Sequence, residues 1–166
     1  MKRVMVIGCP GSGKSYFSKK LSDITGLPLY HLDLLYWNED RSHVEKQVFV
    51  DKMIDILKTT YWIIDGNYNS TIELRLKVCD TVIFLDYPLN VCLNGIRERE
   101  GAVRDDVPWE SNIGEQNNDE FISFIENYEL KSKPVILDLL KKYSKKDVYI
   151  FHSREEADLF LNKQLN

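Results

Sequence analysis

Residues 8 to 15 read Gly8-Cys9-Pro10-Gly11-Ser12-Gly13-Lys14-Ser15. This run fits the pattern G-x-x-x-x-G-K-[ST]. It stands between a short β-branched apolar run, residues 3–7, and a segment with Phe17, Leu21 and Ile24 at helical spacing. A strand, a glycine-rich loop and a helix in this order gather backbone N–H groups and the positive end of the helix dipole around an anion. The pattern therefore predicts a phosphate-binding loop that follows the first strand.

The residue types inside this loop point to ATP and Mg²⁺ as the ligands. Glycines leave the concave side of the loop free of side chains, so that phosphate oxygens can reach the backbone N–H groups. Lys14 is expected to bridge the β- and γ-phosphates as a catalytic residue, and Ser15 is expected to offer its hydroxyl to Mg²⁺ as a metal ligand. The predicted nucleotide-binding residues are Gly8, Gly11, Ser12, Gly13, Lys14, Ser15 and Tyr16.

Four more strands and a series of amphipathic helices follow along the chain. The strands are expected at residues 27–32, 62–64, 81–85 and 148–151. Helical spacing of apolar residues occurs at about residues 43–58, 71–78, 88–100, 121–128 and 136–143. Ser153, with Glu156 three residues later, forms a capping box that predicts a terminal helix. Continuous apolar strands that alternate with such helices predict an α/β fold with a parallel sheet covered on both faces.

The composition is typical of one globular domain in the cytoplasm. The chain has 166 residues, of which 43% are hydrophobic and 29% are charged. The apolar run at the N-terminus is interrupted at Gly8, which makes it too short for a signal peptide or a membrane span. Cys9, Cys79 and Cys92 are an odd number of cysteines with no CxxC spacing, so neither a disulfide framework nor a zinc site is expected.

The charge pattern argues against a nucleic-acid surface. The net charge is −4, and no stretch joins basic residues with aromatics in the way a nucleic-acid surface would. Binding of an anion must therefore come from a local site rather than from the field of the whole chain. We expect a small-molecule acceptor substrate, no nucleic acid and no membrane, and a monomer or a homodimer.

Acidic residues stand where three of the predicted strands end. Ligands of open α/β sheets bind outside the carboxyl ends of the strands, so these residues are the candidates for chemistry. Asp65, which precedes Gly66, is expected to hold the metal directly or through water. Asp33 is expected either to orient or deprotonate a hydroxyl acceptor as a catalytic residue, or to be an N-cap or turn residue. Asp86 is expected to cap the following helix, and His31 is given no role.

Arginines cluster in the segment of about residues 97–130, where a lid could hinge. Mobile arginines that close over ATP stabilise the charge of the transferred phosphoryl group and exclude water. Arg97 and Arg104 are expected to act in this catalytic way, or else to be surface arginines paired with their acidic neighbours. Arg41 and Arg75 are the only arginines between the phosphate loop and this segment, so they would have to bind any acceptor phosphate.

Taken together, these residues resemble the adenylate-kinase-like proteins known as DNA topology modulation proteins, the FlaR-related group. The resemblance covers nearly the whole chain and rests on the phosphate loop, His31-Leu32-Asp33, residues 62–68, Arg75-Leu76, residues 83–86, Cys92, residues 97–109 and residues 153–157. It implies a single P-loop NTPase domain over residues 1–166, of the kinase type, with a five-stranded parallel sheet in the order 2-3-1-4-5 flanked by helices. It also implies a short helical lid, binding of ATP and Mg²⁺, and a position for Ser153 and Arg154 near adenine.

The chain departs from true adenylate kinases after its third strand. They carry Asp-Gly-Phe-Pro-Arg there, whereas this chain has Asp65-Gly66-Asn67-Tyr68-Asn69, which lacks an arginine for an acceptor phosphate. The acceptor is therefore open among a nucleoside, a nucleoside monophosphate and another small metabolite. The predicted function is an ATP-dependent phosphotransferase. The alternative is a non-catalytic ATP-binding regulator that influences DNA topology or a protein partner, and a GTPase is disfavoured because the chain has no N-K-x-D run.

Overall fold

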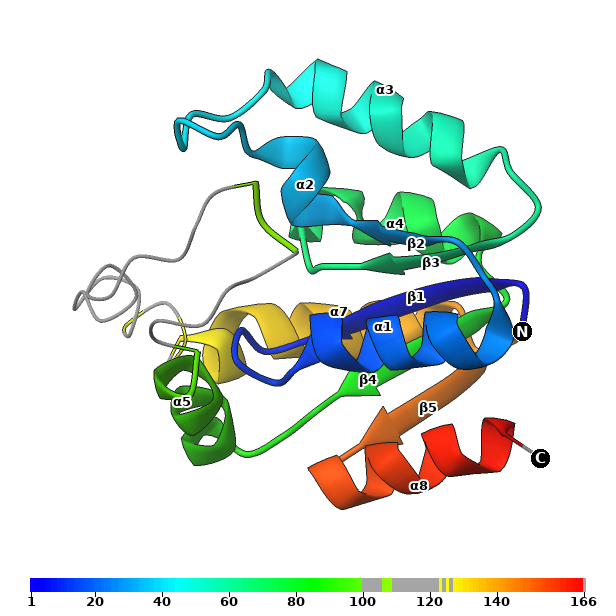
Figure 1. Cartoon of the computed structure of the whole chain (residues 1–166), viewed down its shortest axis with the longest axis vertical. Helices are drawn as coiled ribbons and strands as arrows, with labels where there is room; N and C mark the ends of the chain where they lie inside the picture. The colour runs from blue at the N-terminus through cyan, green and yellow to red at the C-terminus, as the bar shows by residue number, and fades with distance from the viewer. Residues whose placement is uncertain (100–105, 109–122, 124, 126, 166) are drawn as a thin grey trace.

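A parallel sheet forms the centre of the molecule. The computed structural model of the chain describes residues 1–99, 106–108, 123, 125 and 127–165. Its five strands lie in the order β2-β3-β1-β4-β5, and every neighbouring pair is parallel (Figure 1). They are β1 (Arg3–Gly8), β2 (Leu29–His31), β3 (Trp62–Asp65), β4 (Thr81–Leu85) and β5 (Asp147–Phe151). The fold class and the strand order expected from the sequence are confirmed.

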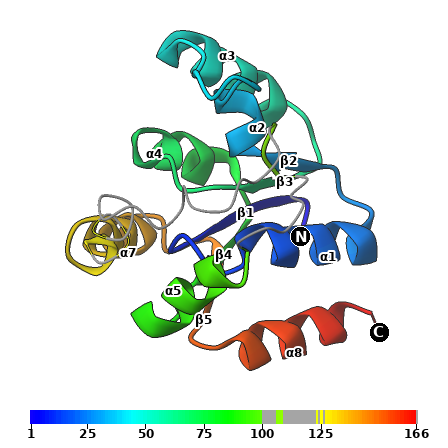
Figure 2. The same ribbon diagram turned by 60° about the vertical axis from the view of Figure 1, so that its left-hand side comes forward.

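Helices connect the strands and cover both faces of the sheet. They are α1 (Lys14–Thr25), α2 (Leu32–Tyr36), α3 (Lys46–Leu57), α4 (Asn69–Val78), α5 (Leu89–Arg97), the π-helical turn η1 (Tyr128–Ser132), α7 (Lys133–Lys142) and α8 (Arg154–Gln164). In Figure 2, α1 and α8 lie on one side of the sheet, and α4 and α7 lie on the other. Within the described part of the chain, no helix has the length and apolar character needed to span a bilayer.

The three central strands carry the core, and their register sets the position of the site. All residues of β3 and β4 are buried, as strands covered on both faces must be. Val6 of β1 stands opposite Asp65 of β3, and Asp65 stands opposite His31 of β2. Gly8 stands opposite Leu85 at the end of β4. The carboxyl ends of four strands therefore meet at one edge, directly below the phosphate loop.

The structure corrects two local expectations. The second strand ends at His31, and the chain turns at once into α2, so Asp33 lies in the first turn of a short helix rather than at a strand end. Asp86 does not cap α5, whose N-cap is Pro88; instead Asp86 Oδ1 lies 2.8 Å from Lys133 Nζ at the start of α7. In the second case the partner of the half-buried Asp86 comes from a distant helix, so the spacing of residues around Asp86 does not reveal it.

The capping box at the terminal helix is confirmed. The Ser153 hydroxyl accepts a hydrogen bond from the Glu156 N–H at 3.3 Å. The Glu156 carboxylate in turn accepts one from the His152 N–H at 2.7 Å. One N–H group of the first turn of α8 and the N–H of the residue before the N-cap are thereby satisfied, which fixes the entry of this helix beside β5.

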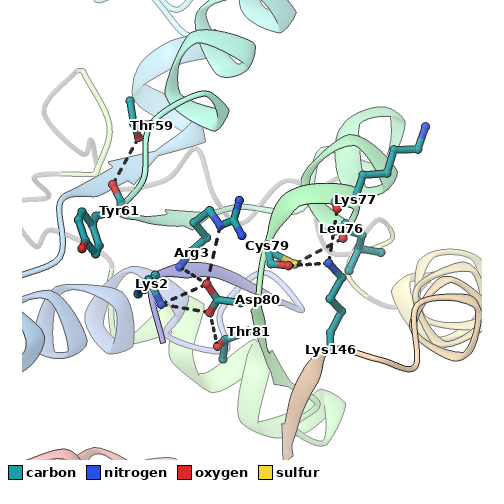
Figure 3. A network of polar contacts seen from close by, with 10 residues as sticks. All are labelled: Lys2, Arg3, Thr59, Tyr61, Leu76, Lys77, Cys79, Asp80, Thr81 and Lys146. Carbon is teal, nitrogen blue, oxygen red and sulfur yellow. Dashed lines mark hydrogen bonds and ion pairs between the residues drawn. The ribbon is translucent and has the colours of Figure 1, made fainter.

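A separate polar network ties the amino edge of the sheet together (Figure 3). The Asp80 carboxylate, just before β4, accepts hydrogen bonds from the backbone N–H groups of Lys2 at 3.1 Å and Arg3 at 2.8 Å. The Thr81 hydroxyl donates to the same carboxylate at 2.8 Å. On the other side of β4, Lys146 Nζ donates to the Cys79 carbonyl at 2.7 Å. These contacts anchor β1 and β5 to the start of β4, at the end of the sheet opposite the phosphate loop.

Candidate active site

The phosphate loop joins β1 to α1 and leaves the start of the helix open. Gly13 is the N-cap of α1, with a φ of 86° that favours glycine, and it has no side chain that could cap the first N–H groups. Among the described residues, a Cβ placed on Gly13 would meet no atom within 4 Å beyond its chain neighbours and the helix's own backbone, so nothing in this part of the chain covers that point of the helix start. This is the geometry that a phosphate group requires.

The back of the loop packs tightly against α5, a contact that the sequence pattern does not reveal. A Cβ on Gly11 would lie 2.0 Å from the Cys92 carbonyl oxygen, and a Cβ on Gly95 would lie 2.1 Å from the Gly11 carbonyl oxygen. Two backbones therefore meet where only glycine fits. Gly95 is thus a structural part of the loop's support, although it lies far from the motif in the sequence.

Lys14 folds back over the loop that it follows. Its Nζ donates hydrogen bonds to the Gly8 and Cys9 carbonyls, both at 3.1 Å. Burial, and then the positive charge of Arg99, lower the pKa of the Lys14 ammonium below its usual value. The carboxylates of Asp65 and Asp33 oppose this shift, and the Lys14 charge lowers the pKa of Asp33 in turn. Lys14 therefore lies within electrostatic reach of both carboxylates.

Ser15 and Asp65 are the residues that could hold a metal ion beside the loop. The Ser15 hydroxyl donates to Asp106 Oδ2 at 2.5 Å, and Asp106 is 6% exposed. Asp65 is 3% exposed, and its Oδ1 lies 2.9 Å from His31 Nδ1. Its Oδ2 is buried without a hydrogen-bond partner among the described residues, which leaves a lone pair suited to a cation or its water. Ser15 and Asp65 stay predicted metal ligands, and the sequence pattern did not indicate that His31 and Asp106 contact them.

The donor set fits Mg²⁺ bound together with a nucleotide rather than a cage made by protein alone. Within the described residues, no group of three or more His, Cys, Asp or Glu side chains converges on one point. Mg²⁺ keeps several waters and is usually held by one or two protein oxygens plus substrate phosphates. Ser15 and Asp65, next to the open start of α1, match this requirement.

Asp33 and Tyr68 form a half-buried polar pair on the β2 side of the site. The Tyr68 hydroxyl donates to Asp33 Oδ1 at 2.7 Å. Burial raises the pKa of the Asp33 carboxyl above its usual value, while Tyr68 and then Lys14 oppose this shift, and Asp65 and Asp106 add to it. Asp33 therefore faces the same space as Lys14, and it caps no helix end, since the N-cap of α2 is His31.

Arg75 turns inward and is not available to an acceptor. Its guanidinium is fully buried, donates to the Gly66 carbonyl at 2.7 Å, and also contacts the Asn67 carbonyl. Burial lowers the pKa of Arg75 to about 9. An acceptor phosphate would therefore not reach Arg75 as it stands here, because the side chain is fully buried and its two Nη atoms donate to loop carbonyls. Its Nε is buried without a partner among the described residues.

The other expected site residues lie around the phosphate loop or outside the described chain. Arg97 is exposed on α5, with its Nη1 3.5 Å from Asn94 Oδ1. Arg104 and most of the segment expected to form a lid lie outside the described residues. Arg154 Nη2 lies 3.1 Å from Glu98 Oε2. It is also 3.1 Å from the position that a Cβ on Gly95 would take, so Arg154 lies on the α5 side of the phosphate loop. Tyr16 is 61% exposed, and Ser12 is buried, with a hydroxyl that has no partner among the described residues.

Comparison with solved structures finds the same fold in shikimate kinases. The shikimate kinase from Acinetobacter baumannii, in complex with shikimate, has a TM-score of 0.64 at 13% identity, covering 99% of this chain and 91% of that chain. The shikimate kinase from Bacteroides thetaiotaomicron has a TM-score of 0.60 at 17% identity, covering 98% and 95%. No profile of a protein family matches the sequence, and no curated protein matches it.

These likenesses define the class of fold. Proteins of such low identity share an architecture and not necessarily a reaction, so the comparison assigns the chain to the fold of the P-loop kinases and no further. The finer resemblance to the DNA topology modulation group stays a prediction.

Proposed function

We propose that the protein is a kinase that transfers the γ-phosphoryl group of ATP to a hydroxyl group of a small acceptor bound beside Asp33. One observation carries this proposal: Lys14 at the start of α1 and Asp33 in the first turn of α2 follow β1 and β2 at the same carboxyl edge of the sheet, within electrostatic reach of one another. A cation for the phosphates and a base for the acceptor thus face one another at the carboxyl edge of the sheet.

The reaction follows from this arrangement. The acceptor hydroxyl gives its proton to the Asp33 carboxylate, and its oxygen attacks the γ-phosphorus in line. The bond from that phosphorus to the bridging oxygen breaks, and ADP leaves with the electron pair. Lys14 offsets the negative charge on the transferred group, and Ser12 and the N–H groups around Gly13 hold the phosphates. Mg²⁺, which Ser15 and Asp65 would hold, supplies further charge neutralisation.

The choice of acceptor follows from what the site offers. Of the two arginines expected to bind an acceptor phosphate, Arg75 is buried and donates to carbonyls, which leaves Arg41 alone to bind the phosphate of a nucleoside monophosphate. A hydroxylated metabolite or a nucleoside is therefore the favoured acceptor class, and the shikimate bound by the Acinetobacter kinase is one compound of that kind to test. In this proposal Arg97 and Arg104 approach the phosphates from the segment after α5, and Arg154 lies near the adenine.

A screen for phosphoryl transfer tests the proposal. Wild-type protein is incubated with Mg²⁺ and γ-labelled ATP against a panel of nucleosides, nucleoside monophosphates and small hydroxylated metabolites, shikimate included. Lys14→Ala provides the background. Label is expected in a non-phosphorylated acceptor with the wild type only. Transfer to no compound of the panel would reject the enzyme and leave the alternative of a non-catalytic nucleotide-binding regulator, whereas transfer to nucleoside monophosphates alone would reject the acceptor class.

A further inference from the structure

The loop after β3 contacts both halves of the site. Asn67 Oδ1 accepts a hydrogen bond from the Gly8 N–H at 3.1 Å, and Asn67 Nδ2 donates to the Gly8 carbonyl at 2.8 Å. This two-point pairing fixes the first residue of the phosphate loop from a segment 59 positions away in the sequence. The same Gly8 carbonyl accepts a hydrogen bond from Lys14 Nζ. Asn67 therefore orients one of the two carbonyls that hold the catalytic lysine.

Tyr68, the next residue, contacts the acceptor side of the site instead of the phosphate loop. Tyr68 has a φ of 41°, in the left-handed region that a bulky side chain rarely adopts. Its ring packs against Phe49 and Tyr36, with centroids 4.8 and 5.1 Å apart, and its hydroxyl donates to Asp33. Strained backbone of this kind persists only where surrounding contacts impose it, and it is found often at functional sites.

Arg75 holds this loop from below. It donates to the carbonyls of Gly66 and Asn67, and its Nη2 lies 3.4 Å from the Thr71 hydroxyl. Burying a guanidinium costs several kcal/mol unless its donors are satisfied. The burial of Arg75 against two loop carbonyls therefore suggests that the conformation of this loop matters. Arg75 thereby fixes the peptide groups on either side of Asn67. The side chain of Asn67 contacts the phosphate loop, and the side chain of Tyr68 contacts Asp33.

We propose that residues 66–68 form a bracket that sets the spacing between the phosphate loop and the acceptor base, with Asn67 and Tyr68 as positioning residues and Arg75 as their support. This proposal rests on the proposed function, because it gives the acceptor side of that reaction its geometry. Asn67 acts on ATP through Gly8 and Lys14. Tyr68 acts on the acceptor through Asp33. Neither side chain is assigned a bond to a substrate.

Two near-isosteric variants test the two contacts of the bracket separately: that of Asn67 with Gly8 and that of Tyr68 with Asp33. Asn67→Asp keeps the acceptor for the Gly8 N–H but replaces the donor to the Gly8 carbonyl with an oxygen. We expect its dissociation constant for a non-hydrolysable ATP analogue with Mg²⁺, measured by calorimetry, to rise roughly tenfold, the cost of one buried hydrogen bond. Tyr68→Phe keeps the ring packing and removes only the hydroxyl, so its affinity for the analogue should change less than about twofold.

The second readout is the titration of Asp33, followed by the carboxyl carbon signal of labelled aspartate and assigned with Asp33→Asn. The charged and titratable groups that face Asp33 are Lys14 from α1, Asp65 from β3, Asp106 and Tyr68. Tyr68→Phe removes a hydrogen bond to the ionised form, so the pKa of Asp33 should rise. Asn67→Asp places its new carboxylate beside Gly8 and should move this titration less than Tyr68→Phe does.

Asn69→Asp is the matched control. Asn69 is the exposed first residue of α4, and its amide lies 3.3 Å from Ser132 Oγ, away from both contacts. This variant should change neither readout. If Asn67→Asp prevents folding, Asn67→Ala provides the same measurement, because it deletes both bonds without adding a charge.

Two results would overturn the bracket. One is an unchanged analogue affinity in the Asn67 variant together with an unchanged Asp33 titration in Tyr68→Phe. The other is that each variant alters both readouts alike, which would reduce the loop to a general structural turn. Neither measurement requires turnover. If both give the expected results but the protein transfers no phosphoryl group, the proposed kinase activity is rejected and the positioning role of residues 66–68 stands.

Discussion

The donor side and the acceptor side of the proposed site are built in different ways. The proposed donor side consists of eight consecutive residues, in which Gly13 and the start of α1 leave room for a phosphate group. The acceptor side joins Asp33 on α2 to Tyr68 beyond β3, two residues that are 35 positions apart. A loop that is local in sequence can be recognised as a motif, whereas a pair that is assembled by a sheet has no motif.

Burial shifts the pKa values of the two key residues, Lys14 and Asp33, in opposite directions. It lowers the pKa of the Lys14 ammonium and raises the pKa of the Asp33 carboxyl, so both groups are driven toward their neutral forms. Each partly restores the charge of the other. The two sides are therefore coupled electrostatically, and single substitutions can show how far they act independently.

The largest effect is expected from Lys14→Ala. Loss of the ammonium removes the main protein charge that stabilises the transferred phosphoryl group, so the rate of transfer should fall by roughly 10³-fold or more. The measurement is the initial rate with the acceptor found by the screen, with circular dichroism to verify the fold. A loss smaller than about tenfold would mean that the donor side does not depend on this residue.

Asp33→Asn should be nearly as damaging to turnover while sparing ATP. The amide keeps an oxygen for the Tyr68 hydroxyl but cannot accept the acceptor proton, so kcat should fall about 10²- to 10⁴-fold. The affinity for the ATP analogue should change little, because Asp33 is absent from the phosphate loop. An equal loss of ATP binding would show that the two sides cannot be separated.

The same variant should stabilise the protein near neutral pH. The folded pKa of Asp33 is raised, so its contribution to stability is fully present below the unfolded value of about 3.8 and is lost as the pH rises through the folded pKa. At pH 7 the wild type therefore carries a costly buried carboxylate that Asn removes. Thermal unfolding at pH 7 and pH 3 should show the advantage of Asp33→Asn at the higher pH, and an advantage that is equal at both would contradict this account.

The smallest functional effect is expected at the amino edge, which belongs to neither side. Burial opposes ionisation of Asp80, but hydrogen bonds from the N–H groups of Lys2 and Arg3 and from Thr81 lower its pKa overall. Asp80→Asn should lower the free energy of unfolding by about 1 kcal/mol at pH 7, with analogue affinity and kcat unchanged. Because the pKa is depressed, the wild-type advantage should fade as the pH drops through the folded value. Impaired ATP binding in this variant would show that the two ends of the sheet are coupled.

The sequence predicted the strands and their order, whereas the contacts on the acceptor side were predicted only in part. Apolar runs and glycines marked the strands and the loop after β1, because these signals lie in residues that are adjacent in the sequence. His31 was given no role, since its contact with Asp65 depends on the pairing of β2 with β3. Asn67 and Tyr68 stood out only as the place where an expected arginine was missing.

Two charged residues show why the remainder could not be read from the chain. Arg75 looked like a possible phosphate ligand, but the packing of α4 on the sheet turns it toward the carbonyls of residues 66 and 67. Asp86 looked like a helix cap, but it pairs with Lys133 from α7. A pattern gives the charge of a side chain, and only packing decides which partner satisfies that charge.

By itself, the sequence determined the phosphate loop, the alternation of strands and helices, and the carboxylate that follows the third strand, because each depends on contacts within a few residues. The tertiary structure alone decided which carboxylates lie near Lys14, that Arg75 binds loop carbonyls of the protein itself, and how residues 66–68 contact both the phosphate loop and Asp33. The physical reason is that the parallel sheet brings the ends of distant strands to one edge. There, desolvation favours pairing between buried polar groups that are far apart in the sequence, such as His31 with Asp65 and Asn67 with Gly8.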